Sequence, residues 1–146
     1  MRHHSRILMA LLVVSALGAA CSRPGASPAP TPPPAAETAV RVTDLDLGRS
    51  LGADKRVTDK TDSFKPNETV YVSVTTDGSA SSATLKARWT FQDGQVVQES
   101  SQTIAPTGTA VTEFHVSNPA GWPRGSYKVE VFLNGSSVET ESFKVG

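Results

Sequence analysis

Cysteine and histidine are scarce in this 146-residue chain. Cys21 is the only cysteine, so a disulfide within the chain is excluded. Two of the three histidines are His3 and His4, which leaves His115 as the only histidine beyond the N-terminus. A zinc site needs about three or four Cys, His or carboxylate ligands in one place. The sequence therefore predicts no zinc site, no other metal centre and no cofactor, and the stability of the fold must come from an apolar core.

Clustered positive charge is also missing. The chain has 14 Lys and Arg residues against 14 Asp and Glu residues, with the two signs interspersed. Nucleic-acid-binding domains present a basic patch or stripe instead. We therefore expect no nucleic-acid partner.

No apolar run reaches the length of about 20 residues that a membrane-spanning helix needs. The longest run is Ile7–Leu17, which follows the basic residues Arg2 and Arg6 and precedes the small residues of 18–20. This order of a basic start, a short apolar run and small residues is typical of a removable secretory signal. Residues 1–20 contain two arginines and no acidic residue. Their removal would leave two more acidic than basic side chains in the rest of the chain.

The signal ends in Leu17-Gly18-Ala19-Ala20-Cys21, which resembles the lipobox of bacterial lipoproteins in its looser form. The resemblance implies that residues 1–20 are removed and that a diacylglycerol is attached to Cys21, which anchors the protein in a membrane of the bacterial cell envelope. Ser22 then favours the outer membrane of a Gram-negative cell. The alternative is an ordinary secretory signal that leaves Cys21 as an unpaired thiol.

Proline, alanine and serine dominate residues 22–37. Such a segment favours extended polyproline II structure and acts as a semi-rigid spacer. We predict a tether over 21–37 that follows the lipidated cysteine, with a proline-rich ligand for another protein as the alternative. One domain is then expected over 38–146, a common size for an independent fold.

The remainder of the sequence alternates apolar and polar residues with the period of a β-strand, and turn residues interrupt it at short intervals. Asp93-Gly94 and Asn134-Gly135 are strong hairpin signals, Asp77-Gly78 predicts a break, and a change of phase near Thr43-Asp44 predicts a bulge. The expected strands are Ala39–Leu47, Thr69–Thr75, Leu85–Gln92, Gln95–Ile104, Ala110–Ser117, Gly125–Leu133 and Val138–Val145, with a further short strand around Arg56–Thr58. About seven antiparallel strands without a helix predict an all-β, two-sheet sandwich.

An inward Trp89 on the third main strand, and the stretch Trp122-Pro123-Arg124-Gly125-Ser126-Tyr127-Lys128-Val129, resemble bacterial immunoglobulin-like domains. The resemblance implies that Trp122 closes one end of the sandwich and that Tyr127 packs at the start of the penultimate strand. The cysteine pair of immunoglobulins is absent, so a fibronectin-type or transthyretin-like sandwich is the alternative.

Few residues point to catalysis. His115 alternates with Phe114 and Val116, which predicts that it faces solvent. Asp54, Asp59 and Asp62 share one long loop and offer oxygen ligands for Ca²⁺, but they lack the spacing of an EF-hand. A small hydrolase would need a pair of catalytic carboxylates. The sequence offers several on its expected strands, which are Glu99, Glu113, Glu130, Glu139 and Glu141.

Two aromatic residues are candidates for partner binding. Phe132 is out of phase with the inward residues of its strand, and Trp122 lies in a loop. Aromatic residues with polar neighbours anchor interfaces or sugar platforms. The alternative is that Trp122 plugs the sandwich end and Phe132 covers a loop. We expect a non-enzymatic binding or structural module that engages an envelope protein through a sheet edge or an aromatic patch; carbohydrate or peptidoglycan binding is the second interpretation and a small hydrolase the third.

Overall fold

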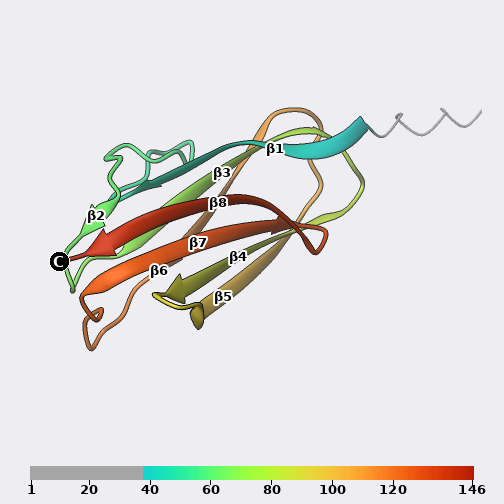
Figure 1. Cartoon of the computed structure of the whole chain (residues 1–146). Helices are drawn as coiled ribbons and strands as arrows, with labels where there is room; N and C mark the ends of the chain where they lie inside the picture. The colour runs from blue at the N-terminus through green and yellow to red at the C-terminus, as the bar shows by residue number, and fades with distance from the viewer. Residues whose placement is uncertain (1–37) are drawn as a thin grey trace, which may run out of the picture. The chain divides into compact units, whose positions relative to one another are not determined.

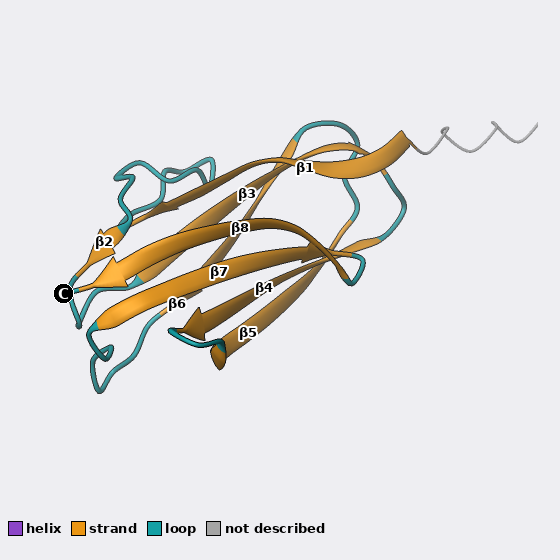
Figure 2. Ribbon diagram, viewed as in Figure 1, coloured by secondary structure: helices purple, strands orange, loops and turns teal. Residues whose placement is uncertain are grey.

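The computed structural model describes residues 38–146, which form two facing β-sheets (Figures 1 and 2). Residues 1–37, with the predicted signal, Cys21 and the tether, lie outside the described residues. No helix in the described part is long and apolar enough to cross a membrane. The strands are β1 (Thr38–Gly48), β2 (Ser63–Phe64), β3 (Val70–Ser79), β4 (Ala83–Phe91), β5 (Gln95–Ile104), β6 (Ala110–Val116), β7 (Gly125–Leu133) and β8 (Ser136–Val145).

One sheet has the order β1-β3-β6 and the other the order β2-β8-β7-β4-β5. All pairings between the long strands are antiparallel, and only the two-residue β2 runs parallel to its neighbour, the end of β8. The predicted all-β, two-sheet antiparallel sandwich is therefore confirmed. It has seven long strands, as the turn signals indicated, and β2 is the addition.

The core lies between the two sheets and is built by alternate residues of each central strand. In β4, the side chains of Leu85, Ala87 and Trp89 are completely buried. Trp89 meets Phe114 of the opposite sheet edge to face, with ring centroids 6.5 Å apart. The same alternation holds for the inward residues of β3 and β7, which are Val70, Val72, Val74, Tyr127, Val129, Val131 and Leu133. Period-two patterning thus predicted the core-facing side of these strands correctly. In β3 the outward Ser73 and Thr75 are buried as well, where Val57 and Arg56 of the loop 49–62 bond to them.

Both predicted hairpins and the predicted bulge are present. Asn134 and Gly135 have φ values of 50° and 85°, which is the left-handed pair that a type I′ hairpin turn requires. Asp93-Gly94 joins β4 to β5. The register of β1 against β3 shifts between Val42 and Asp44, at the predicted change of phase.

The break predicted at Asp77-Gly78 is wrong, because β3 continues to Ser79. Gly78 has a φ of +124°, and a Cβ at this position would lie 2.6 Å from the carbonyl oxygen of Ala39 on β1. The glycine therefore lets two strands approach closely at a register shift rather than ending one of them. Sequence pattern alone does not distinguish these two uses of glycine.

The short strand predicted around Arg56–Thr58 is also wrong. Val57 forms one isolated bridge with Leu51 and is buried, and its backbone N–H donates to the hydroxyl of Ser73 at 3.3 Å. The loop bonds to itself, for example from Gly52 N to Arg56 O at 2.8 Å. Backbone groups that bond within the loop are not available to pair with a sheet. The additional short strand of this region is β2, which follows the loop.

Tyr127 lies at the start of β7, where the resemblance placed it, and joins the sheet to the preceding loop. Its hydroxyl donates a 2.7 Å hydrogen bond to the carbonyl oxygen of Pro123, four residues upstream. Its ring stacks on Phe143 and contacts Phe91 and Trp122, with centroid distances of 5.2, 4.7 and 5.8 Å. A tyrosine that bonds back to the chain in this way is the tyrosine corner of β-sandwiches.

Replacing Tyr127 with phenylalanine removes this hydrogen bond and keeps the ring. We expect Tyr127→Phe to lower the free energy of unfolding by about 1 kcal/mol, which is a fall of about 4 °C in the thermal midpoint of a domain of this size. Thermal unfolding followed by circular dichroism measures the change. Tyr71→Phe is the matched control, because no hydrogen bond of the Tyr71 hydroxyl is present within residues 38–146; equal losses in the two variants would contradict the role of the corner.

Candidate functional site

The two ends of the sandwich differ in their connections. Thr38, the first described residue, lies at one end, and the C-terminal Gly146 lies at the other (Figure 1). The two longest loops, 49–62 and 117–124, both lie at the Gly146 end (Figure 2). The connections at the Thr38 end are 80–82, 105–109 and 134–135, and those at the Gly146 end are 49–62, 65–69, 92–94 and 117–124. Because binding residues sit preferentially on loops that a rigid scaffold positions, the Gly146 end is the candidate functional site.

The loop 117–124 is held in a defined shape. Asn118 binds its own loop three times: its side-chain Nδ2 donates to Gly121 O, its Oδ1 accepts from Ala120 N, and its carbonyl accepts from Gly121 N. The backbone N–H of Trp122 then donates to Pro66 O at 2.7 Å. The loop is therefore preorganised, which lowers the entropic cost of any contact it makes.

Trp122 closes the Gly146 end from inside. Its side chain is only 7% exposed, and its Nε1–H donates to Glu68 O at 3.0 Å. This is the plug that the alternative interpretation described. Contact between Trp122 and a partner stays a prediction, and it involves little exposed ring.

Phe132 lies on the outer face of the five-stranded sheet, as its phase indicated, and it is half-buried under two cations. Lys86 Nζ and Arg88 Cζ lie 4.5 and 4.8 Å from its ring centroid. Glu99 of β5 pairs with Arg88 and, at 3.7 Å, with Lys86. These bonds hold the pKa of Glu99 below its usual value. The cluster is satisfied within its own sheet, so binding through Phe132 also stays a prediction.

The remaining candidates for catalysis or metal binding do not converge. His115 is exposed, and its Nδ1 lies 3.2 Å from Glu113 Oε2. Asp54 and Asp59 pair with different arginines, Arg56 and Arg49. Within residues 38–146, no group of three or more His, Cys, Asp or Glu residues is arranged to hold a metal ion. The calcium alternative on the aspartate loop therefore lacks a site in the described structure.

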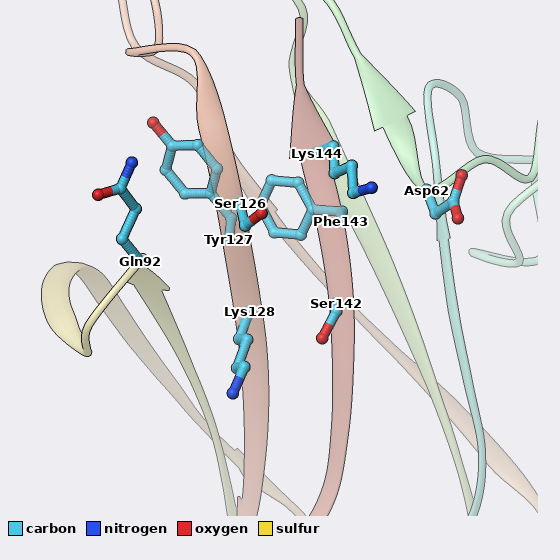
Figure 3. A pocket seen from close by; sticks show the side chains of 8 residues that line it. All are labelled: Asp62, Gln92, Ser126, Tyr127, Lys128, Ser142, Phe143 and Lys144. Carbon is cyan, nitrogen blue, oxygen red and sulfur yellow. The ribbon is translucent and has the colours of Figure 1, made fainter.

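Three surface hollows lie on the half of the sandwich nearer Gly146. The first, of about 260 Å³, crosses the ends of β7 and β8 and is shown in Figure 3. Its polar groups are of both signs, and Lys128 and Lys144 extend in different directions, Lys144 toward Asp62. It is lined by Asp62, Gln92, Ser126, Tyr127, Lys128, Ser142, Phe143 and Lys144. Its two lysines do not converge on one ligand position.

The second hollow lies at the seam between β1 and β8 and is acidic. Asp46, Asp62 and Glu141 line it, and Lys60 binds Asp46 at 2.5 Å. Partial burial, together with the carboxylates of Asp46 and Glu139, raises the pKa of Glu141. Sequence reasoning offered Glu141 only as a carboxylate for a hydrolase and missed this seam. The signal was present in the strand pattern, because Glu141 shares the parity of the inward Phe143 and Val145, and in the structure it pairs with the inward Val129.

The third hollow has no charged residue in its lining. It has a volume of about 350 Å³ and lies between the start of β5 and the loop 117–124. A bulge in β5 opposite Trp89 and Thr90 leaves Val97 unpaired beside this hollow. The lining is completed by Gln98, Val116, Ser117, Asn118, Trp122 and Pro123.

No family model and no curated protein matches this chain. Among solved structures, an immunoglobulin-like protein from Pseudomonas aeruginosa superposes with a TM-score of 0.51 at 16% identity, over 77% of this chain and 100% of the other. An alkylpurine DNA glycosylase from Pseudomonas fluorescens, bound to DNA with an abasic site analogue, gives a TM-score of 0.51 at 13% identity. The match covers 73% of this chain, which spans only 30% of the glycosylase.

A β-glucosidase from Listeria innocua is more distant, with a TM-score of 0.48, 10% identity and 16% of its length covered. The fold rests on the first two structures, whose TM-scores exceed 0.5, and at these identities they carry no activity across. Together with the two sheets and the tyrosine corner, they identify residues 38–146 as an immunoglobulin-like β-sandwich, as the sequence motif indicated.

The roles of the two candidate aromatics can be separated by their effects on stability. Trp122→Ala leaves a cavity at the sandwich end and an unpaired carbonyl at Glu68, so we expect a loss of about 3–5 kcal/mol in the free energy of unfolding. Phe132→Ala removes a half-buried ring under two cations, and we expect a loss of about 1 kcal/mol. Urea unfolding of the two variants measures both values. A Trp122→Ala protein as stable as the wild type would contradict the plug.

Two glutamates near the Gly146 end are expected to affect stability with opposite signs. The pKa of Glu141 is raised, so its ionised form is disfavoured in the folded state. Glu141→Gln should therefore stabilise the protein at pH 7 by about 0.5 kcal/mol, and this gain should disappear as the pH falls through the folded pKa of Glu141 toward the unfolded value.

Glu68 is the matched comparison. The backbone N–H of Lys65, and then Arg49 at 3.0 Å, lower its pKa. Glu68→Gln should destabilise the protein at pH 7, and the loss should vanish as the pH falls through the folded pKa of Glu68. Thermal midpoints of both variants between pH 3 and 8 test the pair, and effects of the same sign at pH 7 would be inconsistent with this charge arrangement.

Proposed function

We propose that this protein is a lipid-anchored component of the bacterial cell envelope, whose immunoglobulin-like domain is a non-catalytic binding or structural module. The anchor is the lipid on Cys21, and the tether over residues 22–37 separates it from the domain. The outer membrane is the favoured location in a Gram-negative cell. The partner is an envelope protein, engaged by the Gly146 end or an adjacent sheet edge.

The observation that carries this proposal is the asymmetry of the sandwich. The chain enters the domain at Thr38, and the two longest loops, 49–62 and 117–124, lie at the Gly146 end. A domain tethered through Thr38 would therefore present its loops away from the anchored end. Short turns at the Thr38 end and preorganised loops at the Gly146 end suit this arrangement.

The second interpretation, binding of carbohydrate or peptidoglycan, draws less support from the structure. Sugar platforms use exposed aromatic faces, and the large hydrophobic side chains that are exposed in residues 38–146 are Val96, Val97 and Val138, none of them aromatic. A hydrolase needs convergent carboxylates. Glu99 and Glu130 are instead held by Arg88 and by Ser137 within the outer face of the sheet.

The anchor is tested by expressing the full chain beside its Cys21→Ala variant in a Gram-negative host. Lipidation predicts that the wild-type protein sediments with membranes and carries the mass of a diacylglyceryl group on an N-terminal Cys21. The variant should lose this modification, and with it the membrane association. Ser22→Ala is a control that leaves the thiol intact. An unmodified, soluble wild-type protein cleaved elsewhere would refute the lipoprotein assignment and leave a secreted binding module.

A further inference from the structure

The edge strand β5 is unusually exposed for a strand of this length. It is the terminal strand of the five-stranded sheet, so one of its edges has no strand beside it. Eight of its ten residues are exposed and the other two are half-buried, although the inward Gln102 reaches across to β6. Val96 and Val97 are 52% and 37% exposed. A long exposed edge is a template for pairing with another strand.

The other sheet edges are blunted in ways that β5 lacks. β1 has two register shifts, carries the charges of Arg41, Asp44 and Asp46, and meets Lys60 of the following loop at Gly48. β2 has only two residues. β6 is short, and Gln102 of β5 donates to its Glu113 carbonyl at 2.6 Å. Natural edges avoid association by charge, bulges, shortness or cover, and the only such device in β5 is the bulge near its start.

The charge of β5 is compatible with a second copy of itself. Glu99 is the only charged residue in the strand, and Arg88 and Lys86 of the same sheet already neutralise it. Two copies of β5 can pair antiparallel about a two-fold axis at Ser100 or Ser101. In this pairing the inward side chains of both strands lie on the same face of the joined sheet. Glu99 then lies opposite Ser101 or Thr103, never opposite the other Glu99. Small hydroxyl side chains meet at the axis, and like charges do not.

We propose that β5 is a self-association surface, through which two copies of this chain join their five-stranded sheets edge to edge. The contact is isologous and closes at two copies, so it does not build a fibre. One strand edge buries less than the roughly 1,600 Å² of a standard interface, so the dimer is weak and depends on protein concentration. The proposal stands on β5 alone and does not depend on the lipid anchor.

Cysteine substitution tests the geometry directly, because residues 38–146 contain no cysteine. Opposed Cα atoms of an antiparallel pair lie about 4.5–5.5 Å apart, within the range for a disulfide. In a full chain that carries Cys21→Ala, we expect mild oxidation to give a covalent dimer with Ser100→Cys or Ser101→Cys, whichever lies at the axis. The Cys21→Ala chain itself, and the same chain with Thr140→Cys on the outer face of β8, are the controls and should stay monomeric on non-reducing gels.

A charge at the axis supplies the second test. Ser101 is exposed and lies opposite Lys86 of β4, so Ser101→Glu should fold normally. Its carboxylate meets Glu99 of the other copy if the axis passes through Ser100, and its own counterpart if the axis passes through Ser101, so like charges meet in either case. Sedimentation velocity over a concentration series should show that it weakens the dimer about fivefold or more. Ser142→Glu, opposite Lys128 on the outer face of β8, is the matched control and should leave the dimer unchanged. The proposal is overturned if neither serine variant crosslinks above the controls, if Thr140→Cys crosslinks equally, or if Ser101→Glu associates like the wild type. Each of these results would leave the test of Cys21 lipidation unaffected.

Discussion

The aromatic cluster around Tyr127 is the contact on which the rest of the structure depends. The Tyr127 ring lies between Phe91, Phe143 and Trp122, and its hydroxyl holds Pro123. Through these contacts one residue joins three strands of the large sheet to the loop 117–124. Trp122 extends the cluster to Glu68, in the loop before β3 of the other sheet. With no disulfide within the chain, packing and hydrogen bonding of this kind close the sandwich end.

This cluster also explains why the Gly146 end can carry function. Loops that rest on a buried aromatic cluster keep their shape, so their exposed atoms are preorganised for contact. The same packing argues against sugar binding through Trp122, because a tryptophan that closes the core exposes little of its ring to a ligand. The structure uses its large aromatic residues for stability and leaves valines of β5 at the surface.

Charged residues are arranged differently at the different edges of the two sheets. Opposite charges pair across the outer face of the large sheet around Phe132, whereas carboxylates face one another at the seam of β1 and β8. The seam therefore discourages strands from adding beside β1 or β8, at some expense in stability near Glu141. No comparable repulsion protects β5, since its single carboxylate is already paired. The contrast between these edges is the physical basis for the proposed dimer.

The sequence by itself determined the presence of the seven long strands, the inward residues of β4 and β7, both hairpins and the bulge in β1, because these depend on period-two patterning and local turn chemistry. The lipobox resemblance also comes from sequence alone. Tertiary structure decided the rest. Gly78 continues a strand because β1 passes close to it, and Trp122 is a plug because Glu68 accepts its N–H. Each outcome depends on residues distant in the chain, which local pattern does not reveal.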